Sequence, residues 1–343
     1  MDRHLFSMSC AFVLRGVLLL FMAAGAPAYA QPGGPPADTA ILNDGQLHVI
    51  LVGTGSPLVD ATRAASCVAI IAGGQVILVD TGPGSWRKFG PLGIPQEAVG
   101  TVLLTHFHSD HFGDLGEVMT MSWTSGRPKP LQVYGPPGVD RVVAGFNQAY
   151  AQDIDYRVAH HGEKALPRAA AGAQARVIKP GKPGEAMPVF EQNGVRVIAF
   201  AVEHDPVKPA YGYRIDYQGR SVVISGDTLK SANLTKHAAG ADLLLHDAMA
   251  RDILSMGAAN LERAGQTRRA GMVRDILTYH ASTADAAATA AAANVETLVL
   301  THLVPVPATP MIEQAFTRGL AEIFKGKVVL AKDGLRFDLP PKK

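Results

Sequence analysis

Several short apolar runs in this chain are closed by a histidine or an aspartate, and this pattern limits how the chain can fold. The runs are rich in Val, Ile and Leu and four to nine residues long, which predicts buried strands. The polar residues that close them are His106, His204, Asp227, His246 and His302. Because loops at strand ends can present side chains to a common point, we expect these residues to meet at one edge of a sheet.

Predicted strands and helices are interspersed in both halves of the chain. The predicted strands cover residues 47–53, 67–80 as a hairpin, 101–106, 131–135, 195–205, 211–227 as a hairpin, 242–247, 297–302 and 327–339. The predicted helices cover residues 139–151, 284–293 and 311–324. This order favours an α/β fold in which two sheets pack face to face with helices on the outside.

The first thirty residues are typical of an export signal. A basic start precedes an apolar stretch from Ala11 to Met22, and a small-x-small pattern closes the segment at Ala30. The stretch is shorter than the roughly 20 residues of a membrane span, although an N-terminal anchor is the alternative. We predict a signal peptide over 1–30, a flexible lead over 31–40 and one domain over 41–343. The mature protein would be periplasmic or secreted, without stable membrane insertion.

The charge balance gives no sign of a nucleic-acid partner. Without residues 1–30 the chain carries 30 Lys and Arg against 29 Asp and Glu. Proteins that bind the phosphate backbone usually display a clear excess of positive charge. We therefore expect no nucleic-acid partner and a small molecule as the substrate.

Residues 106–111, with the sequence HFHSDH, place three histidines and an aspartate within six positions. Imidazole nitrogen and carboxylate oxygen are the ligands that Zn²⁺ and related divalent ions take in proteins. Since no cysteine accompanies them and a carboxylate can bridge two ions, the pattern predicts a catalytic site with two divalent cations. Zn²⁺ is the first expectation, with Mn²⁺ and Fe²⁺ as alternatives. A solvated loop without metal is the other interpretation.

At these residues the sequence resembles the metallo-β-lactamase superfamily, whose His-x-His-x-Asp-His signature is matched by residues 106–111. Later ligands of that family have counterparts in the same order at His204, Asp227 and His302. The resemblance implies a four-layer αββα sandwich of two mixed sheets with the site at one edge. It also implies two ligand groups joined by a bridge: His106, His108 and His204 for one metal, Asp110, His111 and His302 for the other, and Asp227 between them.

Two further segments resemble the ribonuclease Z and arylsulfatase-like branch of the superfamily. LLLHDA (243–248) is similar to its His-Glu-Ala segment, with Asp247 where glutamate is usual. YHAST (279–283) is similar to its His-Ser-Thr segment, with an inserted alanine. The resemblance implies that His280 is a further catalytic histidine and that His246 and Asp247 lie behind the metal ligands.

Asp80 in ILVDTGPG matches the Asp-x-Gly segment of the same family. It is expected to accept a hydrogen bond from a ligating imidazole and so fix its tautomer; an ordinary turn aspartate is the alternative. In the expected reaction, two metal ions lower the pKa of a water molecule. Asp110 would orient that water and take its proton, and His280 would donate a proton to the leaving group.

The absence of a long insertion reduces the range of expected substrates. Ribonuclease Z carries a long arm for tRNA between the third histidine ligand and the bridging aspartate, whereas only 22 residues separate His204 from Asp227. We therefore expect an exported binuclear hydrolase of small esters, arylsulfatase- or phosphodiesterase-like, and not a tRNA 3′-processing endonuclease. A lactonase or another hydrolase of this fold, and a non-catalytic metal-binding protein, are the alternatives. A homodimer is left open.

Overall fold

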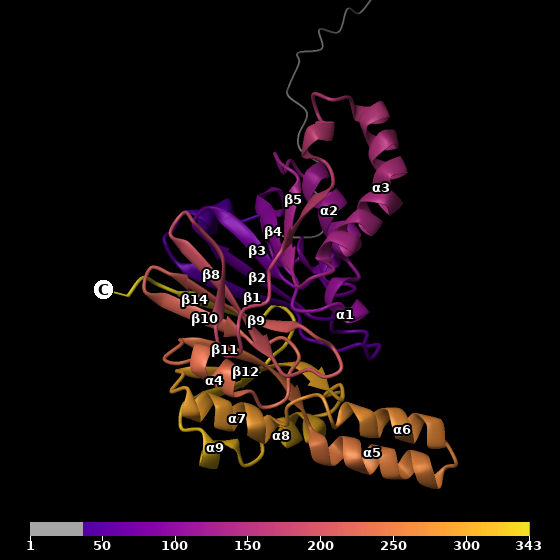
Figure 1. Ribbon diagram of the computed structural model, residues 1–343, viewed down its shortest axis with the longest axis vertical. Coiled ribbons are helices and arrows are strands. Elements are labelled where there is room, and N and C mark those ends of the chain that lie inside the picture. Colours follow the sequence, from indigo (N-terminus) through magenta and orange to yellow (C-terminus); the bar gives the residue numbers. More distant parts are fainter. Residues whose placement is uncertain (1–36, 343) are drawn as a thin grey trace, which may run out of the picture. The chain divides into compact units, whose positions relative to one another are not determined.

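The apolar runs form fourteen strands in two seven-stranded sheets in the computed structural model, which describes residues 37–342 (Figure 1). In spatial order, the first sheet contains β14 (Arg336–Leu339), β1 (Leu47–Gly53), β2 (Cys67–Ala72), β3 (Gln75–Val79), β4 (Val99–Leu103), β5 (Leu131–Gly135) and β6 (Ala173–Val177). The second contains β13 (Lys327–Leu330), β12 (Thr297–Val304), β11 (Leu243–Met249), β10 (Arg220–Ile224), β9 (Ala210–Tyr217), β8 (Val195–Val202) and β7 (Ala186–Gln192).

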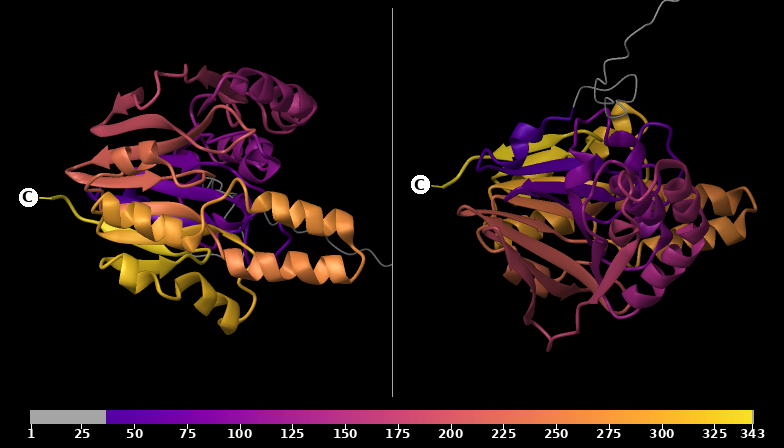
Figure 2. Two further views of the ribbon diagram at one scale, coloured as in Figure 1. Left: turned by 60° about the horizontal axis from the view of Figure 1, so that its bottom comes forward. Right: turned by 90° about the horizontal axis from the view of Figure 1, so that it is seen from above.

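Helices flank the two sheets, which confirms the predicted αββα sandwich (Figure 2). The helices after strands of the first sheet are α1 (Ser109–Phe112), α2 (Leu115–Thr124) and α3 (Val139–His161). Those associated with the second are α4 (Ala232–His237), α5 (Arg251–Arg263), α6 (Thr267–Ile276), α7 (Thr283–Ala292), α8 (Pro310–Thr317) and α9 (Leu320–Ile323). Short 3₁₀ helices cover Thr39–Leu42, Trp86–Lys88, Gln96–Ala98 and Arg168–Ala170. No helix within residues 37–342 combines the length and apolar character needed to cross a membrane.

The strands near the centre of the sandwich are apolar on both faces because each face meets another layer. Along β1, Leu47, Val49 and Leu51 belong to the core between the sheets, whereas Ile50 and Val52 belong to the core under the helices. All seven residues of β1 are buried. This explains why the sequence shows continuous apolar runs in place of strict alternation.

Parallel strands bring the polar residues to one edge. Strands β3 to β6 run parallel in the first sheet, and β10 to β13 run parallel in the second. The carboxyl ends of such strands lie at the same edge, where the connecting loops can form a site. The strand-end residues of the two sheets therefore face one another.

The observed elements differ from the predicted ones in several places. The helix predicted over 139–151 continues to His161, and the helix predicted over 311–324 is interrupted by Gly319, whose φ is 73°. The run predicted as one strand over 327–339 divides between the two sheets as β13 and β14. The helices α5 and α6 were not expected, because they bury only Leu254, Ala258 and Ala270 and so show a weak apolar pattern. The predicted signal peptide over 1–30 lies outside the described residues.

Gly82 allows the turn after β3 to approach the loop that carries the motif. A Cβ at this position would lie 2.2 Å from the carbonyl oxygen of Asp110 and 2.7 Å from backbone atoms of Ala65 and Ser66. Backbone atoms cannot move aside by a change of rotamer. The close approach also allows the amide of Thr81 to donate to the carbonyl of His111 at 2.7 Å.

We expect Gly82→Ala to lower the free energy of unfolding by about 1–3 kcal/mol, because the added methyl group forces the backbone of the motif loop to shift. Gly90→Ala is the matched control, since a Cβ there meets no heavy atom within 4 Å. Urea denaturation measures both variants. Equal stability of the two would show that the close approach at Gly82 is not required.

Candidate metal centre

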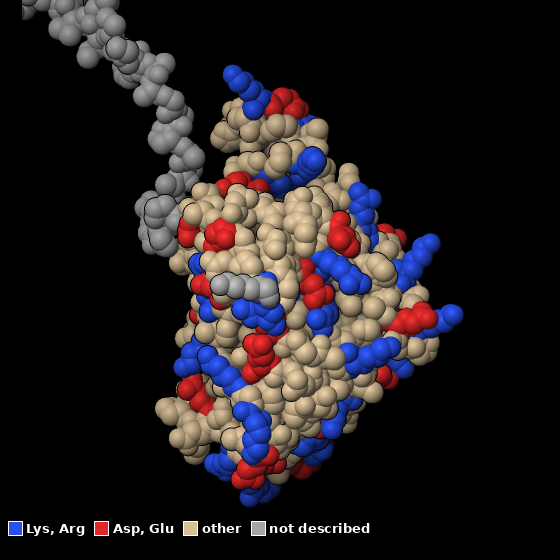
Figure 3. Space-filling model, turned by 90° about the vertical axis from the view of Figure 1, so that its left-hand side faces the viewer, with Lys and Arg blue, Asp and Glu red and all other residues tan. Residues whose placement is uncertain are grey.

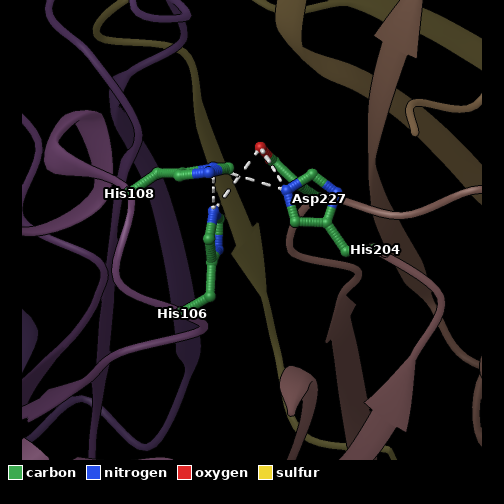
Figure 4. Close-up of side chains that lie close together, drawn as sticks. All are labelled: His106, His108, His204 and Asp227. Carbon is green, nitrogen blue, oxygen red and sulfur yellow. Dashed lines mark hydrogen bonds and ion pairs between the residues drawn. The ribbon is translucent and has the colours of Figure 1, made fainter. Parts of the chain in front are cut away.

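Three of the predicted histidines and the predicted bridging aspartate converge at the edge of the sandwich (Figure 4). His106 and His108 follow β4, His204 follows β8 and Asp227 follows β10. The distance from His108 Nδ1 is 3.0 Å to His106 Nε2 and 3.4 Å to His204 Nε2. Asp227 Oδ2 lies 3.8 Å from Nε2 of both His106 and His204.

The remaining predicted ligands form a second group beside the first. His302 Nε2 lies 3.1 Å from Asp110 Oδ2, and His111 Nε2 lies 3.5 Å from the same oxygen. Asp227 Oδ2 is 3.3 Å from His111 Nε2 and 3.5 Å from His302 Nε2. The carboxylate of Asp227 is therefore within 4 Å of nitrogen atoms in both groups.

The donor set fits divalent cations. Within residues 37–342, His111 Nε2 and Asp227 Oδ1 are buried without a hydrogen-bond partner. A buried polar atom without a partner lowers the free energy of unfolding by about 1–3 kcal/mol, so a bound ligand that contacts this atom would stabilise the fold. The ring nitrogens of His106 and His108 face each other at 3.0 Å, where their lone pairs repel unless a proton or a metal ion lies between them. Imidazole and carboxylate without sulfur are typical of sites for zinc and related ions.

The pKa shifts favour a cation at Asp227, His106 and His204 but not at His111 and His302. Burial opposes ionisation of Asp227, but the charges of His302 and His111 outweigh it and hold the pKa of the carboxyl well below its usual range. Burial lowers the pKa of His106 and of His204, which favours the neutral form of both rings at pH 7. At His111 and His302 burial is outweighed by Asp227, which raises the pKa of both rings. A proton and a metal ion therefore compete for these two histidines.

Asp80 orients one of these rings from behind. Its Oδ2 lies 2.7 Å from His111 Nδ1, and its Oδ1 accepts the backbone N–H of Thr105 at 2.8 Å. This leaves His111 Nε2 directed at the cluster, as a ligand requires. Asp80 is itself buried.

Two orienting groups were not predicted from the sequence. The hydroxyl of Thr105 lies 3.0 Å from His106 Nδ1 and 2.9 Å from the Asp80 carboxylate. The carbonyl of Tyr279 accepts from His204 Nδ1 at 3.0 Å. Thr105 stands beside the motif, so its position was a usable signal. A backbone carbonyl leaves no signal in a sequence.

Backbone strain is concentrated at two of the site residues. Asp80 and His302 have φ values of 60° and 47°, in the left-handed region that ordinary side chains avoid. His302 is also the extra residue of a β-bulge, because Thr301 pairs with Asp247 and the next pair is Leu303 with Ala248. A bulge redirects a side chain within a strand. His246 lies within β11 and His302 lies within β12. The prediction that these two histidines close their strands was therefore wrong.

His280 lies behind the second group and contacts Asp247. His280 Nδ1 is 3.0 Å from Asp247 Oδ2, and His246 Nδ1 is 3.1 Å from Asp247 Oδ1. Ring centroids place His280 5.3 Å from His302 and 5.4 Å from His204. Aspartate in place of the usual glutamate thus still reaches the histidine. One ring nitrogen of His280 is held by the carboxylate, which leaves the other to act toward the cluster.

The segment after His280 is fixed by a helix cap and a short β-bridge. Ser282 Oγ accepts the backbone N–H of Asp285 at 3.1 Å, and the Asp285 carboxylate accepts the N–H of Ser282 at 3.1 Å. This capping box begins α7. The amide of Met249 donates to the carbonyl of Ala281 at 2.9 Å, so the segment with the inserted alanine pairs with the end of β11.

Comparison with known proteins agrees with this geometry. A family model described as a beta-lactamase superfamily domain matches residues 75–303. Ribonuclease Z of Mycobacterium avium is 40% identical over 290 residues, which are 84% of this chain and 96% of that protein. Ribonuclease Z of Mycobacterium bovis is 36% identical and covers 87% of this chain and 100% of that protein. The crystal structure of human tRNase Z, short form, has a TM-score of 0.58 at 22% identity and covers 85% of this chain and 99% of that chain.

These relatives overturn the predicted function. We expected a hydrolase of small esters without a nucleic-acid partner, whereas relatives at 36–40% identity over most of the chain are ribonucleases. The stretch between His204 and Asp227 is indeed filled by β9 and β10. However, this chain spans 96% of the Mycobacterium avium protein, so a ribonuclease Z of this length has little room for an additional arm. Net charge misled us too, because it averages over the whole surface and hides local clusters.

The predicted export to the periplasm or the medium is contradicted by the same relatives, which bear the name of a ribonuclease and not of an exported esterase. The apolar segment on which that prediction was based lies outside the described residues. The fold, the matched domain and the identity over nearly the full length of the relatives agree with one another. The chain therefore belongs to the metallo-β-lactamase superfamily of hydrolases and, within it, to the family of the ribonuclease Z proteins.

Proposed function

We propose that this chain is a metal-dependent endoribonuclease that hydrolyses a phosphodiester bond at the 3′ end of transfer RNA precursors. The observation that carries the proposal is 40% identity to a ribonuclease Z across 84% of the chain. The cluster of imidazoles and carboxylates supports it, because the seven ligands expected of the superfamily fall into two groups, and within each group the candidate ligand atoms lie within 4.8 Å of one another.

The proposed cofactor is a pair of divalent cations, with zinc first among them. His106, His108 and His204 would hold one, Asp110, His111 and His302 the other, and Asp227 both. When bound, such a pair supplies Lewis acidity, which lowers the pKa of a water molecule and stabilises negative charge on the phosphate. The side chains that orient the rings, Asp80 and Thr105, restrict the geometry in which this can happen.

The chain supplies the proton transfers. The pKa of Asp110 lies well below its ordinary value, since contacts with His111 and His302 outweigh its burial, so its carboxylate is ionised and can orient a water molecule by accepting a hydrogen bond from it. Attack of water on phosphorus breaks the bond to the 3′ oxygen of the upstream nucleotide. That oxygen leaves as a strongly basic alkoxide unless it receives a proton, and His280, held by Asp247, would donate it.

A transfer RNA transcript extended at its 3′ end tests the proposal. We expect the zinc-loaded protein to remove the extension, leaving a 3′ hydroxyl on the transfer RNA and a 5′ phosphate on the released fragment. A chelator should abolish the reaction, and the transcript that ends at its mature 3′ end is the control substrate. The proposal fails if the extended transcript stays intact under conditions in which the protein holds its metal.

Asp227→Ala should reduce metal content at both positions, because Asp227 Oδ2 lies within 4 Å of ligand nitrogens of both groups. Loss of a residue that only orients a ligand costs 10–100-fold in affinity, so loss of a shared ligand should cost more than about 100-fold. Asp216→Ala is the control, since Asp216 on β9 is half-buried and contacts Arg214. Elemental analysis showing two full equivalents of metal in Asp227→Ala would refute the bridging role.

His280→Ala should slow cleavage of the RNA by on the order of 10²–10⁴-fold, because the 3′ oxygen needs a proton to leave. A nitrophenyl phosphodiester, whose leaving group departs without a proton, should be affected far less. Metal content should not change. The control is His160→Ala on the exposed face of α3. Equal losses for both substrates, or loss of metal, would mean that His280 is a ligand or a structural residue and not a proton donor.

A further inference from the structure

A pair of helices projects from the edge that carries the site. Helices α5 and α6 form a hairpin over residues 251–276, which extends away from the two sheets in Figures 1 and 2. The chain enters it directly after β11, which contains His246 and Asp247, and leaves it just before His280. Both ends of the hairpin are therefore tied to the candidate site. With a rise of 1.5 Å per residue, the 13-residue α5 carries the tip about 20 Å away from its base.

The hairpin is rich in exposed arginine. Its 26 residues contain five arginines against three acidic residues, and all five arginines are exposed: Arg251, Arg263, Arg268, Arg269 and Arg274. Among residues 37–342, Arg274 is the only one of these five with an ion-pair partner, Glu262 at 2.8 Å, which links the two helices.

Three of the arginines gather at the tip without a carboxylate partner among the described residues. Arg263 is the last residue of α5, and Arg268 and Arg269 lie in the first turn of α6. Arg263 donates to the side chain of Asn260, and Arg269 donates to Gln266 Oε1 at 3.0 Å. These amide groups restrain the guanidinium groups and leave their positive charges available to an external anion. The tip is therefore a local cationic surface on a chain that is nearly neutral as a whole.

Helix α3 and the face shown in Figure 3 do not show this excess of positive charge. In the view of Figure 1, helix α3 lies on the other side of α1 from the hairpin, and it carries two arginines against three aspartates. One of these arginines, Arg157, pairs with Asp153 at 2.7 Å. On the face shown in Figure 3, basic and acidic side chains lie interspersed. The hairpin thus differs from α3 and from this face in its excess of positive charge.

We propose that the tip of the α5–α6 hairpin, formed by Arg263, Arg268 and Arg269, binds the phosphate backbone of the RNA away from the bond that is cleaved. This inference rests on the proposed function and names the element that holds its substrate. Guanidinium groups suit phosphate because they offer several N–H donors in a fixed plane. A backbone contact at the tip selects RNA long enough to span from the site to the tip. It also replaces the arm whose absence between His204 and Asp227 argued against RNA.

The test is the triple variant Arg263→Gln/Arg268→Gln/Arg269→Gln, since glutamine removes the charge and retains length and helix propensity. The control is Arg176→Gln/Arg196→Gln/Arg318→Gln, which removes the same charge from exposed positions outside the hairpin. With zinc-loaded protein we would measure kcat and KM for the 3′-extended transcript and for bis(p-nitrophenyl) phosphate. Fluorescence anisotropy would measure binding of mature transfer RNA, which is not cleaved, at several salt concentrations.

We expect the triple variant to raise KM for the transcript by about tenfold or more, with kcat and the small diester little affected. Loss of three phosphate contacts should reduce the slope of log affinity against log salt by about 2–3, since each contact contributes roughly 0.7–0.9. The control should behave as the wild type. The inference is overturned if the triple variant binds transfer RNA as the wild type does, or if the control is affected equally.

Two further results separate this inference from the proposed function. If the wild type binds transfer RNA through the hairpin arginines but does not cleave the transcript, the proposed function fails and this inference stands. If the wild type does not bind transfer RNA, this inference fails. Light scattering gives the mass of each variant, and a change of oligomeric state in the triple variant alone would mean that the hairpin contacts a second copy of the chain and would overturn the inference.

Discussion

The structure depends on one electrostatic constraint: seven imidazole and carboxylate side chains converge at one edge of the fold, and six of them are buried. These side chains cannot satisfy one another's hydrogen-bonding capacity, because the ring nitrogens of His106 and His108 face each other. Buried atoms of His111 and Asp227 also lack hydrogen-bond partners among the described residues. Bound cations would satisfy the donors in both groups at once. Metal binding and folding of this edge should therefore be coupled.

The same constraint explains why the fold needs two sheets. His106, His108, Asp110 and His111 follow a strand of the first sheet, whereas His204, Asp227 and His302 come from the second. Each ligand group contains residues from both sheets, so neither sheet could form a group alone. The bulge at His302, the strained turn at Asp80 and the cap of α7 each orient a part of this edge. The scaffold accepts local strain where it fixes the direction of a side chain.

The sequence predicted the fold class and most strands, because continuous apolar runs of strand length, closed by polar residues, are easily recognised in a sequence. The residues predicted as ligands are brought together by the structure, and their roles stay predictions. The bulge at His302 and the carbonyl of Tyr279 could not be predicted, since a register shift and a backbone contact leave no residue pattern. Helices α5 and α6 were missed because they bury few side chains. The substrate was predicted wrongly, because a missing insertion and a net charge do not describe a local surface.

The central claim is that the cluster binds two cations that share Asp227. Anomalous diffraction from crystals of the zinc-loaded protein, recorded above and below the zinc absorption edge, tests it most directly. We predict two separate peaks, one among His106, His108 and His204 and one among Asp110, His111 and His302, with the Asp227 carboxylate in contact with both. A single peak, or peaks that do not contact Asp227, would contradict the account.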